Sequence, residues 1–386
     1  MMELDCAEIL RYLVGFPTVS RDGNLPLIDW MRNYLSDLRI ESHLVRNAEG
    51  TKSNLFATLG PQVAGGLVLS GHTDVVPVDD QTWSSDPFEL TARGSRLHGR
   101  GACDMKGFIA AVLARAPVWR RAQLRKPVHL MFSYDEEVGC LGVSSLIRAA
   151  RATLVEPAAV IVGEPTGMRP ATRHKGLSML RTKVTGVEAH SSLTHRGESA
   201  VMLAAELIAH LGEISRNLAS SAPADGAGFE PPYTTLSINR ITGGTANNIL
   251  AGMCEFIWDI RTLPGESSAA ILRQLASYAE RRLAELSNQG KACAIQTAML
   301  ADVPPLRAEK DGSAARLVRA VAAHGERDIT VPFGTEGGYF QQTGWSTVVC
   351  GPGSIAQAHR PDEFIERSQL AECESFLDRL IERQSS

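Results

Sequence analysis

The first half of the chain alternates short apolar runs with segments whose apolar residues recur at helical spacing. Between residues 25 and 38, leucine, tryptophan, methionine and tyrosine return every three or four positions, which is the spacing of one buried helix face. Apolar runs of strand length follow at residues 53–59, 67–71, 128–133 and 158–162. Segments of helical pattern at residues 108–119 and 143–150 separate the later runs. This alternation predicts a largely parallel α/β sheet with helices on both faces.

The order of the predicted elements changes after residue 176. It becomes strand 177–184, helix 200–218, strand 234–240, strand 254–261, helix 269–286 and strand 292–300. This βαββαβ order is that of a ferredoxin-like unit, in which two helices cover one antiparallel sheet. Glycine at 176 and a Val-Pro-Pro run at 303–305 provide the boundaries. We therefore expect a discontinuous first domain of residues 1–176 and 304–386, interrupted by an inserted domain of residues 177–303.

Length and composition limit the class of protein. A chain of 386 residues with 44% hydrophobic content can bury more than one core, which agrees with two domains. The formal net charge of -4 gives no reason to expect a nucleic acid or a membrane as partner. Acidic residues precede the first apolar run, and no apolar stretch reaches about 18 residues, so we expect neither a signal peptide nor a spanning helix. Seven scattered cysteines without a CxxC pair are typical of reduced thiols in a cytoplasmic protein.

The candidate chemistry begins where the run of residues 67–71 ends, in the sequence GHTDVVP. His72 and Asp74 are two positions apart, so their side chains leave an extended strand end in the same direction. Open α/β sheets bind their ligands at the carboxyl edge of the strands. A histidine beside a carboxylate at that edge is either a metal ligand with the residue that orients it, or a polar pair that satisfies itself.

Three further acidic loops follow predicted strands. Asp104 lies in GRGACDMKG before a helix, Glu136 and Glu137 lie in DEEVG, and Glu164 lies in GEPTG. Each carboxylate by itself could cap a helix or form a surface ion pair. Adjacent acids, however, repel and raise one another's pKa unless a cation lies among them. Four such strand ends on one sheet edge therefore predict a cation site.

A second imidazole comes from the last part of the chain, in GPGSIAQAHRPDEFI. This sequence follows an apolar run at 346–350 and places His359 at the tip of a loop, as either a ligand or a surface histidine. Two imidazoles with several carboxylates suit zinc or a similar divalent ion such as cobalt or manganese. Two ions about 3.5–4 Å apart need one bridging carboxylate, and Asp104 in its glycine-flanked turn is the candidate.

These motifs, with the inserted ferredoxin-like domain, resemble the co-catalytic zinc aminoacylase and carboxypeptidase family over essentially the whole chain. The resemblance implies a three-layer α/β/α zinc-peptidase-like catalytic domain with an inserted α+β lid and dimerisation domain. It implies two zinc ions, one held by His72, Asp104 and Glu164 and the other by Asp104, Glu137 and His359. It also makes Asp74 the residue that orients His72, and Glu136 the general base.

The resemblance suggests substrate contacts as well. GGTANNI is similar to a segment of the family that contacts substrate, through either Asn247 or Asn248, although the following ILAGMCEF departs from the IPxE form common in relatives. His190, in VEAHSS of the inserted domain, would stabilise the carbonyl oxygen after lid closure or from a partner subunit. The alternative role of His190 is that of a surface histidine on the lid.

Two further residues have competing interpretations. Arg261 could bind the substrate carboxylate with its planar guanidinium, or form a structural ion pair with Asp259 or Glu255. Glu336, in FGTEGGYFQ, could meet a positive substrate side chain or fix its own glycine turn.

The expected reaction is metal-assisted hydrolysis of a small-molecule N-acyl amino acid by a cytoplasmic homodimer. N-acetylornithine is the expected substrate, and succinyl-diaminopimelate or N-acetylcitrulline is the alternative. A ligand-binding protein without catalysis is disfavoured because binding alone needs no unligated Glu136. A two-metal phosphate-ester hydrolase would need more arginine or lysine in the ligand loops than Arg100 and Lys106.

Overall fold

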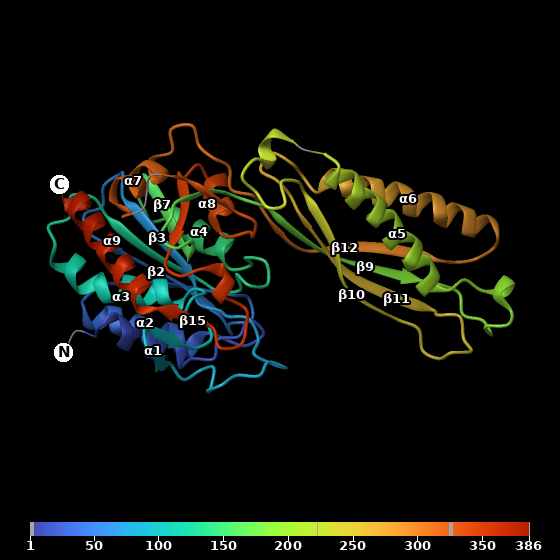
Figure 1. The fold of residues 1–386 in the computed structure, drawn as a ribbon, viewed down its shortest axis with the longest axis horizontal. Coiled ribbons are helices and arrows are strands. Elements are labelled where there is room, and N and C mark those ends of the chain that lie inside the picture. The colour runs from blue at the N-terminus through green and yellow to red at the C-terminus, as the bar shows by residue number, and fades with distance from the viewer. Residues whose placement is uncertain (1–3, 222, 324–326, 386) are drawn as a thin grey trace. The chain divides into compact units, whose positions relative to one another are not determined.

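The computed structural model describes residues 4–221, 223–323 and 327–385, which divide into two compact units (Figure 1). Unit 1 comprises Met1–Arg173, Leu306–Thr330 and Thr335–Ser386, and unit 2 comprises His174–Pro305 and Val331–Gly334. Unit 2 is thus an insertion in the sequence of unit 1. The short segment Val331–Gly334 groups with unit 2, whereas the boundaries drawn from the sequence assign it to the first domain.

Within the described residues, unit 1 is built around an eight-stranded mixed sheet. Its strands are β1 (Ser42–Arg46), β2 (Ser53–Leu59), β3 (Leu67–His72), β6 (Val128–Ser133), β7 (Ala159–Pro165), β8 (Ala171–His174), β13 (Ile329–Val331) and β14 (Thr347–Gly351). They lie in the order β1-β2-β6-β3-β7-β14-β8-β13. The β6, β3, β7 and β14 strands are parallel, whereas the β1–β2, β2–β6 and β14–β8 pairs are antiparallel. The sheet is therefore mixed and not largely parallel as predicted. The short turn between β1 and β2 accounts for one of the antiparallel pairs, because neighbouring strands joined in this way can pair only antiparallel.

Helices cover both faces of this sheet. They are α1 (Cys6–Val14), α2 (Leu25–Asp37), α3 (Lys106–Arg121), α4 (Val143–Arg151), α7 (Ser313–Val321), α8 (Gly337–Gln342) and α9 (Arg367–Ser385). Because strand side chains alternate between faces, Leu67 and Leu69 of β3 join one apolar core with α1, α2, α3, α7 and α9. On the opposite face, α4 contacts β2 and β6, and α8 contacts β7 and β14. The predicted three-layer α/β/α fold is thereby confirmed.

A small sheet in unit 1 brings two distant loops together. Among the described residues it contains β4 (Thr91–Arg93), β5 (Arg96–His98) and β15 (Phe364–Glu366), in the order β15-β5-β4. Phe364 pairs with His98, so the turn that follows β5 lies next to the loop that precedes β15.

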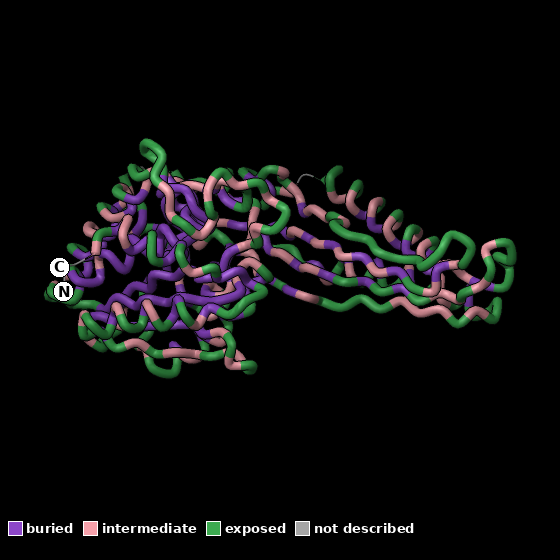
Figure 2. The backbone as a smooth tube through the Cα atoms, turned by 90° about the horizontal axis from the view of Figure 1, so that it is seen from below, coloured by how far each residue is buried: buried purple, intermediate pink, exposed green. Residues whose placement is uncertain are grey.

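Unit 2 has the βαββαβ order that the sequence predicted. It consists of β9 (Leu177–Thr185), α5 (Ala200–Ala219), β10 (Thr235–Gly243), β11 (Met253–Arg261), α6 (Ala269–Asn288) and β12 (Ala294–Val303). In the part of the chain that is described, these strands form an antiparallel sheet in the order β10-β11-β9-β12. Alternate residues of the strands, such as Phe256 and Trp258, form a core with α5 and α6. Figure 2 shows the buried positions continuing along these strands. None of the described helices is long and apolar enough to cross a membrane.

Candidate metal centre

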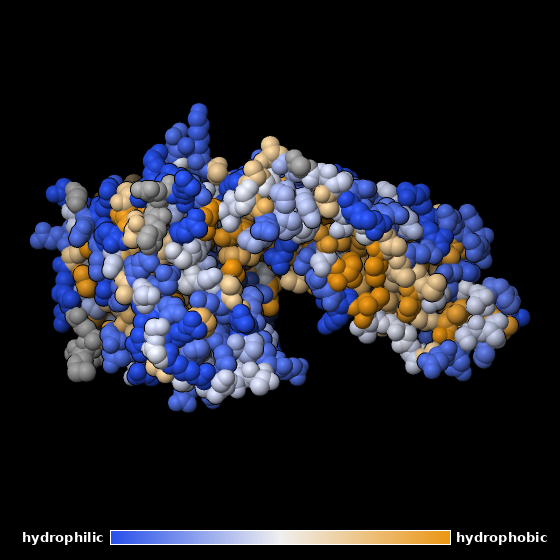
Figure 3. All heavy atoms as spheres, viewed as in Figure 1, coloured by the Kyte–Doolittle hydropathy of each residue, from blue (hydrophilic) through white to orange (hydrophobic). Residues whose placement is uncertain are grey.

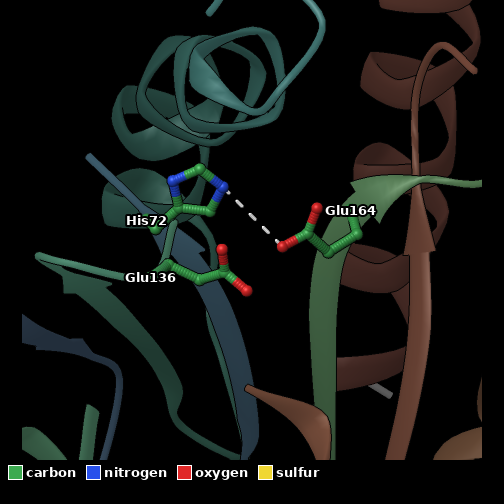
Figure 4. Close-up of side chains that lie close together, drawn as sticks. All are labelled: His72, Glu136 and Glu164. Atoms are coloured by element: carbon green, nitrogen blue, oxygen red, sulfur yellow. Dashed lines mark ion pairs between the residues drawn. The ribbon is translucent and has the colours of Figure 1, made fainter. Parts of the chain in front are cut away.

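The carboxyl ends of parallel strands bring His72, Glu136 and Glu164 together (Figure 4). His72 is the last residue of β3, Glu164 lies near the end of β7, and Glu136 follows the end of β6. One ligand atom of each side chain lies within 4.8 Å of those of the other two. Nε2 of His72 is 3.7 Å from Oε1 of Glu164. The carboxyl edge of the sheet therefore carries a cluster of imidazole and carboxylate groups, as the sequence predicted.

A second group shares His72 and adds Asp104 and Glu137, again with ligand atoms within 4.8 Å of one another. Asp104 faces two imidazoles through different oxygens. Its Oδ1 is 3.0 Å from Nε2 of His72, and its Oδ2 is 3.3 Å from Nε2 of His359. The same nitrogen of His359 is 3.1 Å from Oε2 of Glu137. All five residues predicted as ligands thus meet in unit 1, and Asp104 is the carboxylate that faces both imidazoles.

The strand that precedes Asp104 belongs to a different sheet from the one predicted. This short strand, β5, pairs with β4 and β15 and does not belong to the eight-stranded sheet. Asp104 lies in the turn between β5 and α3, where the backbone N–H of Lys106 donates to the carbonyl of Gly101 at 2.8 Å. Gly101 has a φ of +79°, a conformation that favours glycine. The prediction of four strand ends on one sheet edge is therefore wrong for Asp104.

Asp74 lies behind His72 and is 2% exposed. Its backbone carbonyl is 2.9 Å from Nδ1 of His72, while its carboxylate is farther away, with Oδ1 at 3.6 Å. The carboxylate accepts the backbone N–H groups of Glu136 at 3.1 Å and Glu137 at 3.2 Å, and the hydroxyl of Ser20 at 2.6 Å. Asp74 therefore holds both the imidazole and the loop that carries Glu136.

Burial and like charge shape the electrostatics of the cluster. Burial raises the pKa of Glu137 and of Glu164, and the nearby Asp104 carboxylate raises both further. Burial also raises the pKa of Glu136, against the opposing effect of His72. Hydrogen bonds to Asp104 and Glu137 raise the pKa of His359 to about 11. Buried carboxylates that repel one another are stabilised by a cation among them.

The donor set fits a divalent metal of the zinc type. It offers imidazole nitrogens and carboxylate oxygens, which zinc and cobalt accept in mixed sites. Cys103 and Cys140 lie nearby, but burial raises the pKa of both thiols well above the usual range, so thiolate ligands are not expected there.

Glu336 is buried in unit 1, with 1% of its surface exposed. Its Oε2 accepts the hydroxyl of Ser70 on β3 at 3.2 Å. Burial raises its pKa to about 7, although hydrogen bonds with Ser133 and Ser70 oppose that shift. These contacts favour a structural role at the strand ends over contact with a substrate side chain.

The remaining candidate residues belong to unit 2. His190 forms an isolated bridge with Ile249, and the carbonyl of Asn248 accepts the N–H of Ser191 at 2.9 Å, so His190, Asn247 and Asn248 lie at one end of this unit. Arg261 ends β11, whose other end, Met253, adjoins that segment. Arg261 is eight residue steps along the extended strand from Met253, a distance of about 26 Å.

Arg261 has a loosely held guanidinium. Its Nη2 is 3.9 Å from Oδ2 of Asp259, and that carboxylate oxygen accepts a shorter hydrogen bond of 3.0 Å from Asn239. The side chain of Arg261 is 34% exposed. The ion pair with Asp259, one of the two interpretations of Arg261, is therefore present, at a distance near the upper limit for such a contact.

Sequence reasoning assigned no role to several residues that support the centre, namely Ser20, Arg100 and Glu363. Glu363 accepts the backbone N–H of Asp104 at 3.1 Å and pairs with Arg100. Arg100 belongs to the motif GRGACDMKG, and Glu363 belongs to AHRPDEFI. An acid four residues after a predicted histidine ligand was the available signal for Glu363.

Comparison with known proteins assigns the class. The model of peptidase family M20/M25/M40 matches residues 68–383, so the chain belongs to this family. It is therefore a hydrolase that acts on amides.

Individual relatives refine this assignment. The acetylornithine deacetylase of Proteus mirabilis (strain HI4320) is 34% identical over 383 residues, which cover 97% of this chain and 95% of that protein. The resemblance that the motifs indicated is thus confirmed. An M20 family metallo-carboxypeptidase from Sulfolobus solfataricus has the same fold, with a TM-score of 0.77 and 19% identity over 99% of both chains. The Bacillus subtilis YXEP protein, a dinuclear metal-binding peptidase, matches with a TM-score of 0.64 and 16% identity over 97% of this chain and 96% of its own.

Proposed function

We propose that the protein hydrolyses the N-acetyl amide of N2-acetyl-L-ornithine to acetate and L-ornithine, a reaction of arginine biosynthesis. The Proteus mirabilis acetylornithine deacetylase supports this substrate, because its identity of 34% extends over nearly the whole chain. We place the reaction in the cytoplasm, because scattered free thiols, most of them buried, are typical of proteins in reducing compartments.

The observation that carries the reaction is the position of Asp104 between two imidazoles, with Glu136 beside His72 and Glu164. In this proposal one divalent ion is held by His72, Asp104 and Glu164, and the other by Asp104, Glu137 and His359. Zinc suits these ligands, and cobalt is the expected substitute. Such a pair of ions, when bound, lowers the pKa of a water molecule and polarises the amide carbonyl.

Glu136 is the general base in this proposal. Its carboxylate removes a proton from the attacking water, whose oxygen bonds to the acetyl carbon. When the carbon–nitrogen bond breaks, Glu136 returns the proton to the leaving α-nitrogen, so that acetate and ornithine are released. The bond from the Glu136 N–H to Asp74 supports this role, because it fixes the loop from which the carboxylate extends.

His190 and Arg261 have separate tasks. The imidazole of His190 donates to the carbonyl oxygen as it gains charge, and the guanidinium of Arg261 binds the substrate carboxylate. Because about 26 Å of strand separates Met253, near His190, from Arg261, one small substrate cannot contact both residues of the same unit 2. We therefore infer that one of them, His190, comes from the partner subunit of a homodimer. Asn247 and Asn248 lie in the same segment and would come with it.

We place the dimer contact on unit 2. The β12 strand ends the sheet order, and apolar side chains of β12, β9 and α6 line a groove beside it, among them Met299, Leu180 and Leu283. Figure 3 shows apolar residues gathered on this unit. An exposed strand edge next to an apolar groove suits a second copy of the chain. Sedimentation of Met299→Glu should give monomer, whereas Met202→Glu, at an exposed methionine of α5 outside the groove, should give dimer.

The alternative substrate is another N-acyl amino acid, such as succinyl-diaminopimelate or N-acetylcitrulline, because the same site chemistry would serve it. The deciding experiment measures acetate release from N-acetylornithine by the zinc-loaded protein, with Glu136→Ala and succinyl-diaminopimelate as controls. We expect strong turnover by the wild type, reduced by roughly 10²–10⁴-fold in the variant. Cleavage of another acyl amino acid instead would retain the mechanism and replace the substrate. Zinc binding without cleavage of any acylated amino acid would favour a ligand-binding protein.

A further inference from the structure

A buried ion pair lies next to the candidate metal centre. Arg100 and Glu363 are both 1% exposed, and Nη1 of Arg100 is 2.7 Å from Oε2 of Glu363. Removing two charges from water costs free energy that their attraction only partly offsets, so such a pair is weak evidence for a gain in stability. Its other contacts give a more specific reason for its presence.

The second carboxylate oxygen of Glu363 holds the turn that carries Asp104. Oε1 accepts the backbone N–H of Cys103 at 2.9 Å and that of Asp104 at 3.1 Å. The carboxylate therefore accepts from the Arg100 guanidinium and from at least two backbone amides. Glu363 fixes the backbone of the residue whose side chain faces both imidazoles.

The same residue also fixes the loop of the second imidazole. Glu363 follows His359 by four positions, and its own carbonyl accepts the backbone N–H of Gly99 at 3.0 Å. Arg100 donates from Nη1 to the carbonyl of Arg360 in that loop at 3.4 Å. The ion pair thus joins two segments that are far apart in the sequence, at the place where Asp104 and His359 lie 3.3 Å apart.

We propose that Glu363 is a positioning residue that sets Asp104 against His359 and thereby determines how tightly the second divalent ion is held. This inference rests on the two-ion site of the proposed function. Glu363→Gln is the sharpest change, because glutamine keeps the size of the side chain but has only one acceptor oxygen. Whichever way the amide turns, either Arg100 or the two backbone N–H groups lose their acceptor.

The test measures zinc binding to the metal-free full-length protein by titration calorimetry, with circular dichroism as the check on folding. We expect two sites in the wild type. In Glu363→Gln the site that includes His359 should weaken roughly 10–100-fold, and the site of His72, Asp104 and Glu164, which shares only Asp104 with it, should weaken less. Glu366→Gln is the matched control, because Glu366 pairs with Arg96 at 2.7 Å in the same β15–β5 pairing but bonds Ser95 and not the Asp104 turn. This control should bind zinc as the wild type does.

A double variant distinguishes an effect of Glu363 on the positions of Asp104 and His359 from a general destabilisation of unit 1. His359→Ala removes the ligand itself, so adding Glu363→Gln to it should weaken binding far less than Glu363→Gln does alone. Wild-type affinity at both sites in Glu363→Gln, or full additivity in the double variant, would overturn the proposal. If Glu363→Gln does not fold, Glu363→Asp replaces it, because the shorter side chain cannot reach both Arg100 and the two backbone amides. The zinc titrations of Glu363→Asp then support or overturn the proposal by the same outcomes. Failure of the wild type to bind two ions would count against the proposed function instead.

Discussion

The hydroxyl of Ser20 donates to Oδ2 of Asp74 at 2.6 Å, behind the candidate metal centre. Both residues are buried. The same carboxylate accepts the backbone N–H groups of Glu136 and Glu137. Asp74 therefore links the loop of Ser20, the end of β3 and the loop of Glu136 through one side chain.

We expect Asp74→Asn to lower kcat by roughly 10–100-fold, because an amide has too few acceptor sites for these donors and the His72 and Glu136 positions relax. Ser20→Ala removes a single donor, so its effect on kcat should be smaller. Hydrogen bonds to charged groups contribute about 1.5–3 kcal/mol, which limits the loss of stability in Ser20→Ala. Steady-state kinetics and thermal denaturation of the two variants test this order. A larger loss of kcat in Ser20→Ala than in Asp74→Asn would contradict it.

Two glycines each precede a candidate metal ligand, and their surroundings differ. A Cβ added at Gly163, before Glu164, would lie 2.1 Å from the ring of Phe108, which is fully buried on α3. The ring is enclosed in the core of unit 1, so we expect Gly163→Ala to destabilise unit 1 by about 3 kcal/mol or more. The displaced β7 end should also weaken zinc binding through Glu164. Chemical denaturation and zinc titration measure both effects.

Gly71 provides the comparison, because it precedes His72 in the same way. A Cβ there would meet Cε of Met105 at 2.9 Å, the end of a flexible side chain that can rotate away. We expect Gly71→Ala to lower the free energy of unfolding by about 1 kcal/mol, which is near the lower end of the range for substitutions that add volume to a core. Equal losses in the two variants would show that ring contact with Phe108 is not the cause.

The parts of the site that the sequence predicted are those with local patterns. A glycine or serine at the end of an apolar run marked the ends of β3, β6 and β7, so His72, Glu136, Glu137 and Glu164 were placed by element order alone. The position of His359 could be predicted only from its sequence motif, because the residues of its loop show no helical or strand periodicity that would indicate where the side chain points.

The parts that could not be predicted depend on pairing between distant segments. The sequence before Asp104 reads as another strand of the main sheet, and only its pairing with β15 removes it from that sheet. The contacts of Glu363 with the Asp104 turn span more than 250 positions and leave no periodic pattern in either segment. The antiparallel pairing of β1 with β2 has a different cause, because it follows from the short turn between two neighbouring strands and not from their apolar content.

Removal of the metal should destabilise unit 1, because all five predicted ligands lie there. A ligand present at 100 times its Kd adds about 2.7 kcal/mol of stability per site. Calorimetric scans of zinc-loaded and chelator-treated protein should therefore differ by several degrees in the transition of unit 1. His359→Ala, which removes one ligand, should show a smaller difference. Identical scans with and without zinc would show that the cluster holds no ion in the folded protein.

The acid sensitivity of the fold should depend in part on His129, which lies on β6 at 2% exposure. Burial lowers its pKa from 6.5 to about 4. Nδ1 is 2.9 Å from the hydroxyl of Thr58, and Nε2 has no hydrogen-bond partner among the described residues. A proton on this ring would therefore place an unpaired charge inside unit 1.

The direction of the effect follows from where protons bind. Between pH 6.5 and about 4 the unfolded chain protonates His129 while the folded chain does not, so stability falls as the pH falls through that range. At about pH 5 this residue should account for roughly 2 kcal/mol of the loss relative to neutral pH. In His129→Gln, urea denaturation of the metal-free protein should show a correspondingly smaller difference between pH 7.5 and pH 5. Between pH 7.5 and pH 9 the free energy of unfolding should change equally in the wild type and the variant, because His129 is then neutral in both the folded and the unfolded protein. If the variant loses as much stability at pH 5 as the wild type does, His129 is not the residue responsible.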